Sequence, residues 1–102
     1  MEQKDFNEHT RVTVTWRDES GKLRPGNFYV YKLFKDSMIV RARDKEGLLR
    51  KLPYADVLKI VKTERVDPEF RFTLPNAILD EKIWKSRTTM FHASSAPNLG
   101  KA

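Results

Sequence analysis

The sequence contains no cysteine and only two histidines, and its four glycines are scattered over 102 residues. Without cysteine, the chain has no disulfide framework, no thiolate zinc site and no cysteine nucleophile. The scattered glycines form neither a phosphate-binding loop nor a dinucleotide fingerprint. A chain of this length has room for a single domain, so a large catalytic α/β fold is also excluded.

The remaining candidates for catalysis are few. His9 and His92 lie outside the segments with strand patterns, and neither is close in sequence to an acid and a nucleophile. No spacing of histidine and acidic residues is typical of a metal site. We therefore expect no catalytic residue, no metal and no cofactor, and the chain is predicted not to be an enzyme.

Long apolar runs are missing as well. No stretch approaches the roughly 18 apolar residues of a membrane span, and the polar start Met1–Asp5 lacks the apolar core of a secretory signal. We expect a protein without membrane contact, and the absence of cysteine is compatible with a cytoplasmic location.

Positive charge is abundant, with a formal net charge of +6. Residues 1–10 carry a net charge of −2, whereas the 13 basic and 6 acidic side chains of residues 11–62 give that segment +7. The basic character thus belongs to one continuous segment rather than to a tail. A segment that folds can present its charge as one basic face.

The same segment shows five short strand patterns. In the first, Val12, Val14 and Trp16 alternate with polar residues, which is typical of a half-buried strand. The predicted strands are Arg11–Arg17, Asn27–Phe34, Met38–Arg43, Leu48–Leu52 and Val57–Lys62. Short turns join them, and a tight turn over Pro53–Asp56 precedes the last. We predict a mainly β fold, with a small five-stranded antiparallel SH3-like barrel over residues 11–66.

Three stretches carry a family resemblance over about residues 5–62. They are Val12–Asp18 leading to Gly21, Lys22 and Gly26, then Asp36–Val40, and finally Tyr54–Ile60. In these stretches the chain resembles the Sm-like RNA-binding family, within the wider SH3-like barrels. The resemblance implies a barrel, RNA as ligand and ring-shaped assembly. Ile39 stands where the family has a base-contacting Asn, and Leu52-Pro53 stands near the position of its Arg-Gly pair, so the resemblance supports the barrel more than the RNA site.

Basic and aromatic side chains are interleaved along the predicted strands. Positive surfaces with interleaved aromatics bind single-stranded nucleic acid by phosphate attraction and base stacking. We predict that Arg41, Arg43, Arg50 and Lys51 contact phosphate and that Tyr29 or Tyr31 stacks on a base. RNA or single-stranded DNA is the expected partner. The alternative explanation of the charge is that outward-facing Lys and Arg keep the barrel soluble.

Both ends of the chain lie outside the predicted barrel. Residues 1–10 form a polar segment in which Asp5 is expected to cap a short helical turn running to His9. Residues 67–87 are expected to form an arm: an extended stretch through Phe70, Phe72 and Leu74, then a helix of about three turns over Pro75–Lys85. Residues 88–102 are expected to be a disordered tail.

The apolar content of the arm leaves two functions open. The arm could dock on its own sheet, or it could bind a protein partner or a second copy through Phe70, Phe72 and Trp84. From the sequence we favour a non-catalytic binding domain for RNA or single-stranded DNA. The alternative is a protein-interaction or accessory module that uses the arm.

Overall fold

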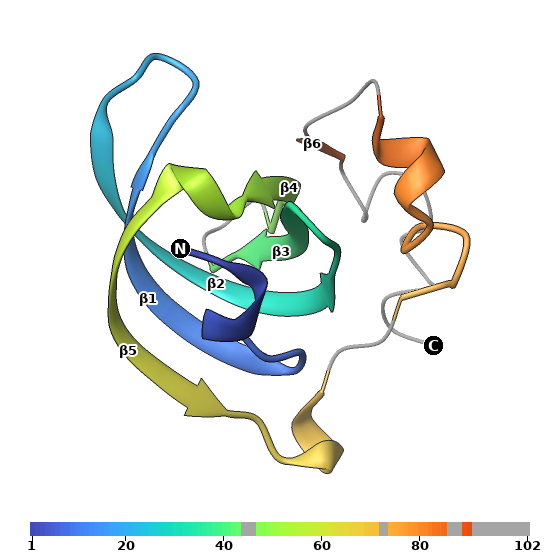
Figure 1. Ribbon diagram of the computed structural model, residues 1–102. Helices are drawn as coiled ribbons and strands as arrows, with labels where there is room; N and C mark the ends of the chain where they lie inside the picture. The colour runs from blue at the N-terminus through green and yellow to red at the C-terminus, as the bar shows by residue number, and fades with distance from the viewer. Residues whose placement is uncertain (44–46, 72–73, 86–88, 91–102) are drawn as a thin grey trace.

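One antiparallel sheet organises the chain in a computed structural model that describes residues 1–43, 47–71, 74–85 and 89–90 (Figure 1). The strands lie in the order β5-β1-β2-β3-β4-β6. They are β1 (Thr10–Arg17), β2 (Leu23–Leu33), β3 (Ser37–Ala42), β4 (Leu49–Pro53), β5 (Val57–Arg65) and the short β6 (Thr89–Met90). In the described part of the chain, four 3₁₀ turns accompany them: η1 (Gln3–Asp5), η2 (Tyr54–Asp56), η3 (Pro68–Phe70) and η4 (Glu81–Trp84).

The five predicted strands are confirmed, but their closure into a barrel is wrong. In the ladder, β5 forms one end of the sheet, while β4 pairs on its far side with β6 rather than with β5. Pro53 ends β4, because proline has no N–H to donate, and η2 then leads the chain into β5. The predicted tight turn before the last strand is therefore present, and the sheet is curved but open.

The inner face of the curved sheet holds the first apolar core, called here the inner cluster. Val12 and Val14 of β1 are each 1% exposed, as their alternation predicted. Phe6, from the segment before β1, closes this core by stacking on Tyr54, with ring centroids 5.6 Å apart. The inner cluster consists of Phe6, Val12, Val14, Phe28, Val30, Met38, Val40, Leu52, Tyr54 and Val57.

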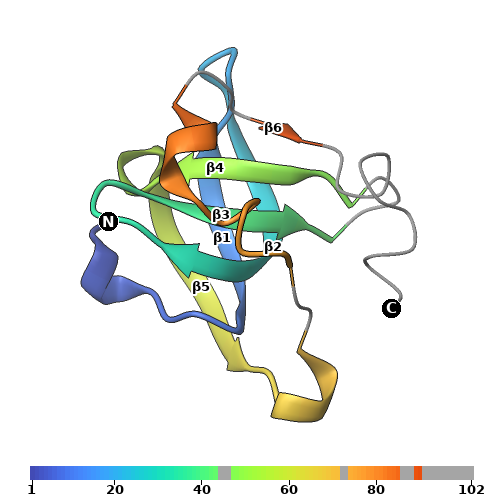
Figure 2. The same cartoon turned by 90° about the vertical axis from the view of Figure 1, so that its right-hand side faces the viewer.

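The outer face carries a second core, the outer cluster, which the C-terminal segment covers. The segment containing η4 lies over β2, β3 and β4 (Figure 2). Trp84 is fully buried there, and its indole Nε1 donates to the carbonyl of Ile78 at 2.6 Å. The arm thus docks on its own sheet, which was one of the two outcomes left open by the sequence. The outer cluster consists of Tyr29, Tyr31, Phe34, Ile39, Leu49, Val66 and Trp84.

The predicted three-turn helix is wrong, because two short turns replace it. Ile78 N–H bonds to Pro75, and Ile83 N–H bonds to Asp80, both with 3₁₀ spacing. Between the turns, Asp80 adopts an extended conformation (φ −79°, ψ 123°), and its carboxylate accepts the N–H of Lys82 as a cap. This capping bond favours a chain break over a continuous helix.

Other boundaries also differ from the sequence prediction. The N-terminal turn covers Gln3–Asp5 instead of running from Asp5 to His9, and the Asp5 carboxylate accepts the N–H of Glu2 at 2.8 Å. The predicted extended stretch at Phe70 is instead the 3₁₀ turn η3. Phe72, His92 and most of the predicted disordered tail over 88–102 lie outside the described residues. The described part of that tail, Thr89–Met90, is not disordered but forms β6, because it pairs with β4. None of the described helices is long and apolar enough to cross a membrane.

Candidate nucleic-acid interface

The two tyrosines predicted to stack on bases are buried in the outer cluster. Tyr29 is 1% and Tyr31 is 3% exposed, and their rings meet edge to face with centroids 4.8 Å apart. Burial raises the pKa of the Tyr31 hydroxyl to about 12. Neither ring offers a free face, so the stacking role predicted for these residues does not fit their positions.

The four predicted phosphate contacts point to different faces of the sheet. Lys51 lies opposite Ile39 in the β3–β4 ladder and so shares the outer face. Arg50 lies opposite Val40, which belongs to the inner cluster. Arg41 lies beside Tyr29 on the outer face, with its guanidinium carbon 5.9 Å from the Tyr31 ring centroid. By this register, the Arg50 side chain lies on the opposite face of the sheet from those of Arg41 and Lys51.

Two of these cations, Lys51 and Arg50, already form intramolecular contacts. The ammonium of Lys51 donates to the backbone carbonyl of Trp84 at 2.7 Å and so fastens the arm to the sheet. The guanidinium of Arg50 forms an ion pair with Glu19 and lies 4.9 Å from the Trp16 ring centroid. The hydrogen bond from Arg50 lowers the pKa of Glu19 below its usual range. Of the four predicted contacts, Arg43 alone is largely exposed.

Strand register assembles a different basic surface on the uncovered part of the outer face. Because Val12 and Val14 point into the inner cluster, Arg11, Thr13, Thr15 and Arg17 point outward. In the β1–β5 ladder, Lys62 lies opposite Thr13 and Lys59 lies opposite Thr15. Together with Arg43 these side chains form what we call the basic strip: Arg11, Arg17, Arg43, Lys59 and Lys62.

The basic strip is large enough for several phosphate groups. Arg11 and Arg17 are six residues apart on one strand, which corresponds to about 20 Å at the usual rise per residue. Uncharged polar side chains lie between them, and the Thr13 hydroxyl donates to the side-chain oxygen of Asn27 at 2.7 Å. An extended anionic chain could therefore contact hydroxyl and amide groups between successive cations.

Glu64 is the acidic side chain that lies beside this surface. It pairs with Lys62 at 2.5 Å and lies opposite Arg11 in the ladder. Its hydrogen bond to Lys62 lowers its pKa, and the charges of Arg11 and Arg43 lower it further. Both arginines are therefore close enough to act on the same carboxylate, which supports the placement of Arg43 with the strip.

Trp16 is the half-exposed aromatic side chain next to these cations. Its ring meets Phe28 edge to face, with centroids 5.5 Å apart, and one side of it faces Arg50. Small surface pockets flank it, one also lined by Arg50 and Lys51 and the other by Asn27 and Arg43. Its alternation with Val12 and Val14 identified it as a core residue, and it occupies the edge of that core.

The sequence contained part of the signal for the basic strip. The period-2 pattern of β1 already places Arg11 and Arg17 together, on the side opposite Val12 and Val14. The positions of Lys59 and Lys62 could not be deduced in the same way, because β5 carries register shifts opposite Thr13/Val14 and Thr15/Trp16. Each shift inserts a residue and changes which side chains share a face.

The residues predicted to bind a protein partner are separated by the fold. Phe70 is 63% exposed on η3, whereas Trp84 is buried against the sheet. Phe72 lies outside the described residues. The arm therefore does not present the predicted anchors as one described apolar surface.

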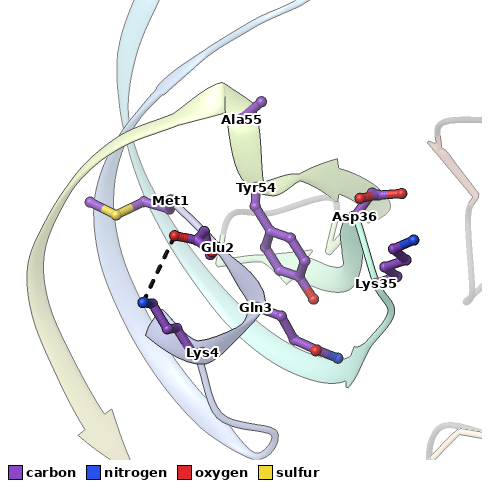
Figure 3. Close-up of a pocket in the computed structure, with 8 residues that line it drawn as sticks. All are labelled: Met1, Glu2, Gln3, Lys4, Lys35, Asp36, Tyr54 and Ala55. Carbon is purple, nitrogen blue, oxygen red and sulfur yellow. Dashed lines mark ion pairs between the residues drawn. The ribbon is translucent and has the colours of Figure 1, made fainter.

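A further surface pocket, of about 510 Å³, lies between η1 and η2 (Figure 3). Tyr54 forms its wall, and its hydroxyl donates to the carbonyl of Phe34 at 2.5 Å. The charged residues around the pocket have both signs: Glu2 and Asp36 are acidic, and Lys4 and Lys35 are basic. This balance favours no class of charged ligand. Within the described part of the chain, no three His, Cys, Asp or Glu side chains group as metal ligands would.

Comparison with known proteins identifies no relative. No protein-family model matches the chain, and neither a curated protein nor a solved structure matches it significantly. The functional assignment therefore depends on the residues and geometry described above.

Proposed function

We propose that this domain is a non-catalytic binder of single-stranded RNA or DNA, and that the basic strip is its phosphate-contacting surface. The observation that carries the proposal is the register of β1 against β5, which aligns Lys59 and Lys62 beside the outward-facing Arg11 and Arg17. Glu64 lies beside Lys62, and Asp56 lines a pocket together with Arg17. The five cations on one face outnumber these acids, and the resulting local positive potential attracts a phosphate backbone.

We also propose that the domain belongs among the small SH3-like folds and is most similar to the Sm-like type. The strand order β5-β1-β2-β3-β4 and the 3₁₀ turn between β4 and β5 support this assignment. The RNA contacts proposed here do not follow from the resemblance, because Ile39 stands where the family has its base-contacting Asn. Of the basic strip, Arg17 and Lys59 lie within the resembling stretches, and the other three residues lie outside them.

The rival function, protein interaction through the arm, has less support. Phe70 and Ile83 are exposed, at 63% and 37%, but Trp84 and Val66 pack into the outer cluster. Leu74, Ile78 and Leu79 also pack against that cluster. Most of the apolar surface that suggested a partner is thus satisfied within the chain.

The test is fluorescence anisotropy with labelled 15-nucleotide single strands at several salt concentrations. If all five cations neutralise phosphates, log K should fall with log salt with a slope of about −3.5, since each contact contributes about 0.7 for a single strand. The triple variant Arg17→Gln/Lys59→Gln/Lys62→Gln should weaken binding at least tenfold at low salt and reduce the slope by about 2.

A matched control variant distinguishes the loss of the binding site from the loss of net positive charge. Lys4, Lys35 and Lys82 are exposed lysines outside the strip, and their triple substitution by Gln removes the same charge. Binding by this control should remain within about twofold of the wild type. Equal losses in the two triple variants, or no binding by the wild type at low salt, would contradict the proposed function.

A further inference from the structure

A pocket of about 410 Å³ lies where the loop before β1 meets the end of β5. His9, Thr63, Arg65 and Arg71 are among the residues that line it. We call it the His9 pocket. It shares no residue with the basic strip, and nothing in the proposed function requires it.

Thr63 and Arg65 reach this pocket because of their register on β5. They lie opposite Val12 and Thr10, both of which are buried, so their side chains lie on the inner side of the sheet. Lys62 and Glu64 alternate with them and lie on the outer side. Since β5 is an edge strand, Thr63 and Arg65 stay exposed at the end of the inner face.

Arg71 is held in place beside them. Its Nε donates to the carbonyl of Val66 at 3.0 Å, which restrains the guanidinium and leaves its two terminal nitrogens available as donors. Among the described residues, no carboxylate forms an ion pair with Arg65 or Arg71. Glu8 also lines the pocket, but its carboxylate accepts the backbone N–H of Leu33 at 3.1 Å.

His9 has an uncommon backbone conformation at this site. Its φ is 59°, in the left-handed region. Among the described residues other than glycine, His9 alone has a positive φ. Its Nδ1 lies 2.8 Å from the Tyr29 hydroxyl. When that hydroxyl donates to Nδ1, the neutral ring carries its proton on Nε2 and can donate it to a ligand. Non-glycine residues held in this conformation are concentrated at binding sites.

We propose that the His9 pocket binds a phosphate monoester on a molecule of about the size of a mononucleotide. Two guanidinium groups, the Thr63 hydroxyl and the His9 ring supply donors around one space, and arginine matches the geometry of phosphate oxygens. The volume exceeds that of a phosphate group alone and is in the range of small-molecule sites. The ester has two possible sources, a free mononucleotide or the phosphorylated end of a nucleic-acid strand.

The first experiment tests the pocket by NMR titration of the full chain with adenosine 5′-monophosphate and with adenosine. The monophosphate should cause saturable shifts at His9, Thr63 and Arg65, and adenosine should bind at least tenfold more weakly. Arg65→Gln should weaken monophosphate binding at least fivefold, whereas Lys35→Gln, a matched loss of charge elsewhere, should leave it unchanged. Absence of saturable shifts at these residues, or equal effects of the two variants, would overturn the inference.

The second experiment identifies the molecule that carries the phosphate ester. It also tests the His9 pocket independently of the basic strip. Oligonucleotides with and without a terminal phosphate are compared on the wild type and on Arg65→Gln. A preference of at least threefold for the phosphorylated end, lost in Arg65→Gln, supports a strand end as ligand. Equal affinities together with monophosphate binding support a free mononucleotide. The strip variant Arg17→Gln/Lys59→Gln/Lys62→Gln should keep its monophosphate affinity, and loss of that affinity would contradict a separate pocket.

Discussion

The two apolar clusters lie on opposite faces of the same sheet, but they are completed in different ways. The inner cluster consists mainly of side chains from the strands, together with Tyr54 of η2. Phe6, from the segment before β1, completes it. The outer cluster needs Val66 and Trp84 from beyond β5, and it covers only the β2–β4 side of the outer face. The remainder of that face, over β1 and β5, carries the basic strip, and β5 also exposes the apolar side chains of Leu58 and Val61. The difference shows that one face of a small sheet can serve both as core and as binding surface.

Trp84→Ala should have the largest effect, because among the described residues of the arm Trp84 is the fully buried side chain in the outer cluster. We expect a loss of about 3–5 kcal/mol in the free energy of unfolding, typical of truncating a buried tryptophan. Chemical denaturation measures it. Phe70→Ala, at an exposed site of the same arm, is the control and should change stability by less than about 0.5 kcal/mol. Similar losses of stability in both variants would contradict the view that burial of Trp84 holds the arm on the sheet.

Gly26→Ala should damage the inner cluster instead. A methyl group at Gly26 would lie 2.6 Å from a Phe28 ring carbon and 2.9 Å from the indole nitrogen of Trp16. Both rings must move to accommodate it, and we expect a loss of about 1–3 kcal/mol, as for other overpacked cores. Gly21→Ala is a useful comparison, because nothing lies near its added carbon and its cost comes from a φ of 83° alone. An unchanged midpoint of unfolding for Gly26→Ala would rule out this close packing.

A pair of tyrosine variants compares the clusters directly. The Tyr54 hydroxyl donates to the carbonyl of Phe34, whereas the buried Tyr31 hydroxyl has no hydrogen-bond partner among the described residues. Tyr54→Phe should therefore cost about 1–2 kcal/mol, because it leaves a buried carbonyl without its donor. Tyr31→Phe should be neutral or stabilising, since it removes an unsatisfied polar group. The reverse order of stabilities would contradict these assignments.

The same tyrosines predict a dependence of stability on alkaline pH. Burial raises the pKa of both hydroxyls from about 10 to about 12 in the folded chain. The folded state therefore holds these protons more tightly, and the resulting stabilisation is complete below pH 10 and is lost as the pH rises towards 12. Spectrophotometric titration of the native protein should show both groups still protonated near pH 11. Ionisation of all tyrosines near pH 10 would show that these rings are exposed.

The smallest effect is expected at the β1–β2 turn, outside both clusters. The carboxylate of Asp18 accepts bonds from Ser20, Lys22 and Arg24, and the Ser20 hydroxyl makes the largest contribution to lowering its pKa. Because the folded pKa is depressed, the stabilisation is complete above the usual pKa of about 3.9 and is lost as the pH falls below it. The difference in stability between wild type and Asp18→Asn should thus be present at pH 7 and diminish in acid. A difference that is independent of pH would exclude this carboxylate as its cause.

The sequence was sufficient for the strands and the inner cluster, because alternation in β1 and the turns around Gly21 and Pro53 are local signals. It was insufficient for closure of the sheet, since only three-dimensional pairing shows that β4 bonds with β6. The strand of Tyr29 and Tyr31 carries large apolar side chains on both faces, which indicates cover on both sides, yet these tyrosines were assigned to a binding surface. The sequence of the strand does not show that Trp84 and Val66 provide the cover. The basic strip was missed for a similar reason: two bulges in β5 decide where Lys59 and Lys62 lie, and bulges have no clear sequence signature here.

His9 also has a consequence for how the chain folds. Its N–H donates to the carbonyl of Val30, and its own carbonyl accepts the N–H of Val66, so one residue joins β2 to the segment that follows β5. Contacts between residues so far apart in sequence form late, because a long loop must close before they contribute any free energy. On a ribosome, the second of these bonds could not form until Val66 had left the exit tunnel. The loop around His9 is therefore expected to be among the last parts of the domain to become ordered.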